Sequence, residues 1–80
     1  MTVKETIDRL EKMIQENEDM NAQNLIDELD QFIIDQRYED DGTEVIEFNK
    51  NYIDLAKWFC EVCFGFKCCV AIEVNKVIFS

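Results

Sequence analysis

The sequence has 80 residues, enough for one small domain, because dividing so short a chain would leave neither part with a sufficient core. Hydrophobic residues make up 48% of it, and it has two glycines and no proline, which excludes a disordered chain or a flexible linker. The formal net charge of −10 excludes functions that need a basic surface, such as direct binding of nucleic acid or of an anionic membrane.

The N-terminal region predicts a protein that stays in the cytoplasm of the cell that makes it. Residues 1–5 are polar or charged overall, and no apolar segment of the kind found in signal peptides follows them. No apolar run approaches the roughly 18 residues that span a membrane. In this compartment we expect the four cysteines to be reduced thiols.

The first expected element is a helix over residues 3–16. Thr2 and Glu5 have the spacing of a capping box, in which each side chain accepts a hydrogen bond from a free backbone amide. An apolar stripe follows at helical spacing, formed by Val3, Ile7, Leu10 and Ile14. Polar residues 17–19 then interrupt the pattern.

A second helix is predicted to begin near Asn21, a favourable N-cap residue, and to continue to about residues 37–38. At 100° per residue its apolar side chains share one arc: Ala22, Leu25, Ile26, Leu29, Phe32 and Ile33. The far side is acidic and has no lysine or arginine at (i, i+4) positions. It consists of Asp27, Asp30 and Ile34, with Glu28 and Asp35 at its flank. We therefore expect Ile34 to be an exposed apolar residue in an acidic helix face.

The second half of the chain predicts one helix and a small sheet. After a turn at residues 39–42, residues 43–48 are typical of a strand, and residues 50–64 of a central helix ended by a left-handed Gly65. Residues 68–79 alternate as a hairpin does.

The hairpin turn is expected at Asn75 and Lys76, which would pair Val74 with Val77. The resulting order is α-α-β-α-β-β. It predicts a single α+β domain over residues 1–80, in which helices cover a small antiparallel sheet formed by the C-terminal hairpin and one short strand.

Acidic residues are concentrated in the middle of the chain. Residues 16–47 contain twelve acidic residues and one basic residue, Arg37, a net charge of −11, whereas residues 48–80 carry +1. Such a field attracts basic partners. The candidate partner-binding residues are Asp27, Glu28, Asp30, Ile34, Asp35, Tyr38, Glu39, Asp40 and Asp41. The alternative is that the carboxylates only keep the protein soluble.

No motif predicts catalysis or a cofactor. The chain has no histidine, its only serine is Ser80, and its two glycines are too far apart to form a phosphate-binding loop. We therefore do not expect an enzyme.

Four cysteines, Cys60, Cys63, Cys68 and Cys69, have a composition that could bind structural zinc as thiolates. However, Cys60 and Cys63 fall on the apolar face of the expected helix. Adjacent Cys68 and Cys69 point to opposite faces of a strand. We favour buried free thiols over a metal site.

Together these features favour a small acidic protein that inhibits or modulates a partner by occupying its basic, nucleic-acid-binding surface. In composition alone it is similar to phage and mobile-element proteins that block host defence nucleases, including anti-CRISPR proteins, with which it shares no motif. The alternative is a structural module that forms a homodimer through its apolar C-terminal half, by way of Trp58 and an uncharged edge strand at residues 77–79.

Overall fold

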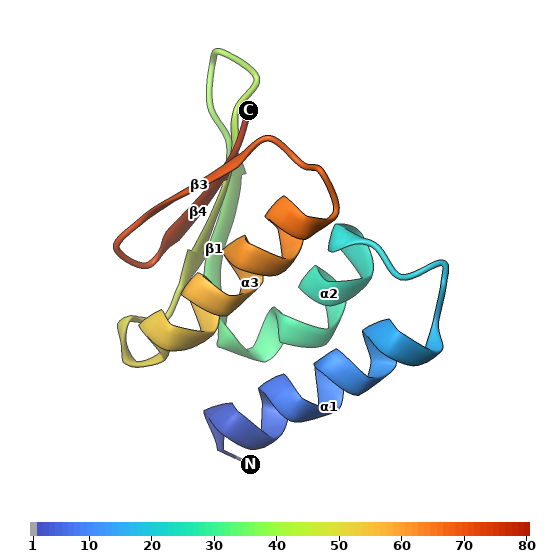
Figure 1. Ribbon diagram of the computed structural model, residues 1–80. Coiled ribbons are helices and arrows are strands. Elements are labelled where there is room, and N and C mark those ends of the chain that lie inside the picture. Colours follow the sequence, from blue (N-terminus) through green and yellow to red (C-terminus); the bar gives the residue numbers. More distant parts are fainter. Residues whose placement is uncertain (1) are drawn as a thin grey trace.

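Three α-helices cover one face of a four-stranded antiparallel sheet in the computed structural model, which describes residues 2–80 (Figure 1). The α+β class predicted from the sequence is confirmed. The observed order is α-α-β-β-α-β-β, so the sheet contains one strand more than predicted.

The helical elements begin and end close to the predicted positions, with one exception. They are α1 (Val3–Glu16), α2 (Ala22–Leu29), the 3-10 turn η1 (Asp30–Phe32), the 3-10 turn η2 (Lys50–Tyr52) and α3 (Ile53–Gly65). The capping box of α1 is present, since the Thr2 hydroxyl accepts a hydrogen bond from the Glu5 amide at 3.1 Å. The exception is α2, which ends at Leu29 and not near residue 37.

The four strands pair in the order β1-β2-β4-β3. They are β1 (Ile33–Tyr38), β2 (Glu44–Phe48), β3 (Val70–Glu73) and β4 (Lys76–Phe79). Strands β2 and β4 are central, and β1 and β3 are the two edges. The prediction of an edge strand at residues 77–79 is therefore wrong, because β4 has a hydrogen-bonded neighbour on each side.

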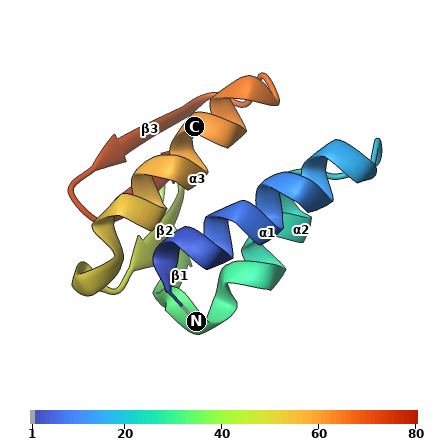
Figure 2. The same cartoon turned by 60° about the horizontal axis from the view of Figure 1, so that its bottom comes forward.

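The core lies between the helices and the covered face of the sheet. Ile46, Phe48 and Val77 of the sheet are fully buried, as is Phe59 of α3, and the rings of Phe48 and Phe59 are 5.8 Å apart. Figure 2 shows α1 crossing the side of α2 and α3 that is turned away from the sheet. Its stripe is anchored by the fully buried Leu10. Burial of side chains this size contributes roughly 1.5–3 kcal/mol each before entropy is subtracted.

The segment predicted to extend the second helix instead forms edge strand β1. Its partner is β2, with Tyr38 opposite Glu44 and Arg37 opposite Val45. The Glu39 amide donates to the Thr43 carbonyl at 2.8 Å, which leaves residues 40–42 as a three-residue loop. Gly42 has a φ of 88°, and its amide donates to the Glu39 carbonyl at 3.0 Å. Ladder hydrogen bonds to a strand that is adjacent in the sequence outweigh the helical periodicity, which is a weak preference over so few residues.

A left-handed residue does end α3, but it is Lys67 and not Gly65. Lys67 has a φ of 65°, whereas Gly65 is the last helical residue and has no positive φ. The Cys68 amide donates to the Cys63 carbonyl at 3.1 Å, and the Lys67 amide donates to the Phe64 carbonyl at 2.9 Å. These two bonds form a Schellman motif with Lys67 in the position that glycine normally occupies.

The β3–β4 turn consists of Val74 and Asn75, one residue earlier than predicted, so that Glu73 is opposite Lys76 and Ile72 opposite Val77. Val74 adopts a φ of 57°, which is unfavourable for a β-branched residue. Asn75 is 3% exposed, and its side-chain amide donates to the Phe48 carbonyl at 2.6 Å. The Phe48 amide donates in turn to the Asn75 carbonyl at 2.8 Å. This reciprocal contact holds the strained turn against the end of β2.

The helix end yields a paired prediction. We expect Gly65→Ala and Lys67→Gly each to raise the free energy of unfolding, by roughly 0.5–1 kcal/mol, since alanine favours a helical position and glycine a left-handed one. A Cβ at position 65 meets nothing within 4 Å. Urea unfolding followed by circular dichroism measures both. A loss of stability in Gly65→Ala with no gain in Lys67→Gly would place the left-handed residue at 65 after all.

Candidate protein-binding surface

Edge strand β1 exposes two large apolar side chains. Ile34 is 57% exposed and Tyr38 is 74% exposed. Ile34 lies at an irregularity in the β1–β2 pairing, where the register shifts between Ile33 and Asp35. The extra residue of such a bulge has no partner across the ladder. The predicted exposure of Ile34 is thus observed, although a strand presents it and not a helix.

Four acidic residues near this strand have no ion pair among residues 2–80: Asp27, Asp30, Asp40 and Asp41. Asp27 accepts a hydrogen bond from the Gln23 side chain at 3.3 Å. Asp41 accepts one from the Thr43 amide at 3.0 Å, and its interactions with Thr43 lower the pKa of its carboxyl group. These carboxylates are free to meet an external cation or basic side chain.

The carboxylates of β1 and β2 are gathered around Arg37. Its guanidinium contacts Asp35, Glu39 at 3.1 Å and Glu47 at 3.5 Å. Hydrogen bonding to Asp35, and then to Glu39, raises the pKa of Arg37. Asp35 and Glu47 are direct cross-strand partners, a pair that would repel without the cation between them. Three carboxylates of the acidic middle segment therefore have a counter-ion within the chain.

Glu28 is also neutralised locally. Its carboxylate accepts from the Arg9 guanidinium at 3.1 Å, so the contact joins α2 to α1. Sequence spacing within the second helix could not reveal it, because the partner lies 19 residues away. Among the predicted binding residues, Glu28 is thus the one whose carboxylate is used in a contact between α1 and α2.

The predicted residues other than Glu28 extend from the end of α2 through β1 to the hairpin loop. A shallow groove of about 270 Å³ brings together Asp30, Ile33, Ile34, Asp35 and Gln36. Strand β1 continues from there to the loop of the β1–β2 hairpin, which holds Asp40 and Asp41 at the far end of the sheet (Figure 1). A six-residue strand spans roughly 20 Å. We call this surface, formed by Asp27, Asp30, Ile34, Asp35, Tyr38, Asp40 and Asp41, the β1 edge.

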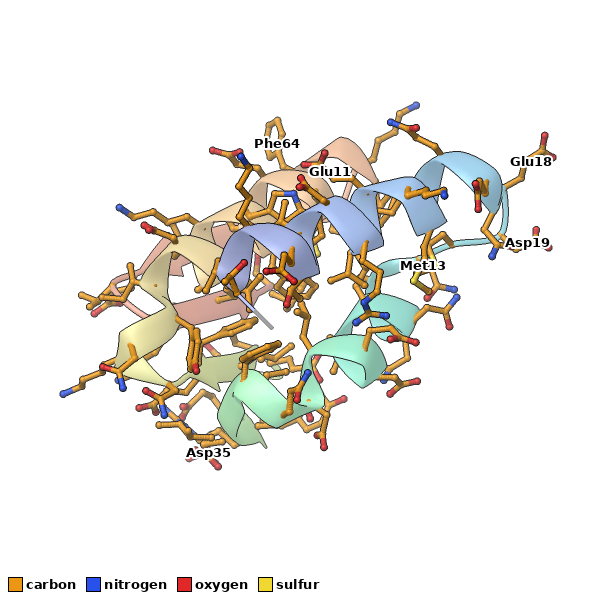
Figure 3. The ribbon with its side chains drawn as sticks, turned by 90° about the horizontal axis from the view of Figure 1, so that it is seen from below. Glu11, Met13, Glu18, Asp19, Asp35 and Phe64 are labelled. Atoms are coloured by element: carbon orange, nitrogen blue, oxygen red, sulfur yellow. The ribbon has the colours of Figure 1, made fainter. Side chains whose placement is uncertain are left out.

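Not all of the acidic segment belongs to the β1 edge. Figure 3 shows Glu18 and Asp19 at one end of the molecule, in the turn between α1 and α2, and Asp35 at a separate place on its margin. Glu11 and Phe64 lie on the side opposite Asp35. Glu47, which is not among the predicted residues, belongs to the carboxylate cluster around Arg37. Its position opposite Asp35 becomes visible only when the strand register is known.

The four cysteines do not form a metal site. Among residues 2–80 no group of three or more histidine, cysteine or acidic side chains is placed to hold a metal ion. Cys63 is buried in α3, whereas Cys69 is exposed. Burial, with smaller contributions from Cys68 and Cys60, raises the pKa of the Cys63 thiol to about 12.

Trp58 contacts α1 of the same chain. The alternative drawn from the sequence placed this residue in a homodimer interface. Its indole N–H donates to the Glu11 carboxylate at 3.0 Å. The two residues line an open apolar groove of about 340 Å³ between α1 and α3, together with Ile14, Val62 and Phe66. No local pattern in the sequence indicates this groove, because its walls come from helices that are distant in the chain.

Comparison with models of known protein families, with curated proteins and with solved structures gives no match for this chain. Among residues 2–80, no helix combines the length and the apolar character needed to cross a bilayer.

The carboxylate cluster predicts a salt-dependent effect. We expect Arg37→Gln to lower the melting temperature at low ionic strength, because Asp35 and Glu47 then face each other without a cation. In about 1 M salt the loss should shrink, since the screening length falls to roughly 3 Å. Lys57→Gln on the exposed side of α3 removes the same charge without touching an ion pair of residues 2–80 and is the control. Equal effects of the two variants would contradict the cluster.

The cysteine environments predict an order of alkylation. At about pH 8, a thiol with a pKa of about 12 has roughly one molecule in 10⁴ as thiolate, so Cys63 should resist iodoacetamide in the folded protein. Exposed Cys69 should react first. Peptide mass spectrometry after timed labelling measures the order, and labelling in urea provides the fully reactive reference. Early modification of Cys63 would show that α3 opens readily.

Proposed function

We propose that this protein is a non-enzymatic binding protein that inhibits or modulates a partner by covering its basic surface with the β1 edge. The observation that carries the proposal is the combination of exposed apolar side chains on edge strand β1 and, at its two ends, carboxylates that have no ion pair among residues 2–80. Ile34 and Tyr38 are exposed beside Asp30, Asp40 and Asp41. Carboxylates that served solubility alone would not require apolar neighbours of this size.

The mixed chemistry of the β1 edge fits a protein partner. Tyrosine is enriched in protein interfaces because its ring is rigid and its hydroxyl remains hydrogen-bonded. Lysine or arginine side chains of a partner would meet Asp27 and Asp30 at one end and Asp40 and Asp41 at the other. The negative electrostatic field of a chain with a net charge of −10 would also increase the rate of association with a basic partner.

A nucleic-acid-binding groove is the class of basic surface that we propose. Such grooves hold lysine and arginine in rows that match phosphates, and carboxylates spread along roughly 20 Å of strand can occupy several of these positions. The partners of this class include nucleases of host defence systems, the targets of phage and mobile-element inhibitors. The chain's length of 80 residues and its net charge of −10 are what support this class of partner.

A charge-reversal experiment tests the β1 edge. We expect Asp27→Lys with Asp30→Lys to weaken binding of a partner captured with the tagged chain on the order of 10-fold. Asp8→Lys with Glu61→Lys, at exposed sites of α1 and α3, changes the net charge equally and should leave affinity nearly unchanged. Circular dichroism confirms that both variants fold. Equal weakening by both pairs would reduce the role of the β1 edge to general charge.

Competition identifies the surface that the partner uses. If the protein covers a nucleic-acid-binding groove, double-stranded DNA or RNA should displace it from the captured partner, and raising the salt should weaken the complex. A complex that resists both nucleic acid and salt would contradict the proposal.

A further inference from the structure

The second edge of the sheet, β3, has backbone groups directed outward. The Ser80 amide donates to the Cys69 carbonyl at 3.1 Å, and Glu73 pairs with Lys76 next to the turn. Residues at alternate positions of an antiparallel strand bond to the same neighbour, so Cys69, Ala71 and Glu73 are directed to β4. The amides and carbonyls of Val70 and Ile72 consequently face away from the sheet. Figure 2 shows β3 at the margin of the molecule, with no element outside it.

This edge lacks the features that normally block strand pairing. Residues 68–72 contain no charged side chain and no proline. The β1 edge, in contrast, carries Asp35, Arg37 and Glu39 within its strand or directly after it. Two apolar side chains are exposed here, Ile72 of β3 at 37% and Val74, directly after the strand, at 67%. The charge of β3 is confined to Glu73, next to the turn, and an edge that is otherwise apolar favours addition of another strand.

The pattern of outward groups on β3 is complementary to itself. If two copies of β3 run antiparallel with Ala71 opposite Ala71, then Val70 of each copy stands opposite Ile72 of the other. Both residues direct their amides and carbonyls outward, so the two pairs form about four backbone hydrogen bonds. Ala71 is exposed and small, which allows close approach at the twofold axis. A closed interface of this kind uses the same patch on both copies.

The charge distribution permits this contact between two acidic chains. Residues 48–80 carry a net charge of +1, and the acidic β1 edge is at the opposite side of the sheet from β3. In the antiparallel register, Glu73 of one copy stands opposite the uncharged Cys69 of the other. No like charges therefore oppose each other across the pair.

We propose that β3 is an interface for a second copy of this chain, which joins two sheets into one continuous eight-stranded sheet through a twofold axis at Ala71. This inference is independent of the proposed function of the β1 edge, and it places the two β1 edges at the outer ends of the dimer. A pairing of short strands buries less than the roughly 1,200 Å² of a standard interface, so the dimer forms reversibly with concentration.

A charge exchange at the axis tests the register. Non-hydrogen-bonded residues in an antiparallel pair are roughly 4.5 Å apart, so like charges at Ala71 repel strongly. Sedimentation velocity from about 10 μM to about 1 mM should show dimer formation by the unmodified chain, and single chains for both Ala71→Lys and Ala71→Glu. An equimolar mixture of the two variants should form a heterodimer, because lysine then faces glutamate. Native mass spectrometry distinguishes it from either homodimer.

Gln36→Lys, at an exposed position of β1, is the matched control and should dimerise like the unmodified chain. A second measurement needs no variant: hydrogen exchange at the Val70 and Ile72 amides should slow as concentration rises, whereas exchange at Tyr38 should not change. An unmodified chain that stays single at about 1 mM, or a mixture that does not associate, would overturn the proposal. If Gln36→Lys prevented dimer formation and the Ala71 variants did not, the interface would be assigned to β1, and the proposal for β3 would be overturned as well.

Discussion

The ladder between β2 and β4 is the contact on which the rest of the fold depends. It joins two hairpins that are separated by α3 in the sequence, with Ile46 opposite Val77 at its buried centre. A two-stranded hairpin is marginally stable by itself in water, so neither hairpin persists without the other. Asn75 closes this ladder, because its side chain supplies the donor to Phe48 that the turn backbone does not. The left-handed Val74 is tolerated because its neighbour is fixed in this way.

The two edge strands on either side of this central ladder come from parts of the chain that differ in net charge. One edge, β1, lies within the acidic part of the chain, and the other, β3, follows α3 in the nearly neutral part. Since β2 and β4 lie between them, the edges are kept apart. The two proposed interfaces, one for a basic partner and one for a second copy, therefore lie at opposite edges of one sheet.

The charge that dominates the sequence is only partly available on the surface. Arg37 binds three carboxylates of β1 and β2, and Arg9 binds Glu28 across two helices. What remains unpaired near β1 is a shorter row of carboxylates at the end of α2 and in the hairpin loop. The folded chain thus reduces repulsion within the sheet and leaves acidic groups at the two ends of one edge.

The sequence by itself determined the α+β class, the bounds of α1, the central helix and the existence of both C-terminal strands, because capping, apolar period and strand alternation are local. It also identified Ile34 and Tyr38 as exposed. Only the tertiary structure decided that residues 33–38 form a strand, that Lys67 takes the left-handed position, and that Glu28 is paired. Each of these features depends on a partner that folding brings near. Strand β1 pairs with β2, and Glu28 pairs with Arg9. The left-handed Lys67 allows the Cys68 amide to donate to the Cys63 carbonyl. Periodicity within a segment carries no information about such partners, so exposed residues such as Ile34 could be predicted while their geometry could not.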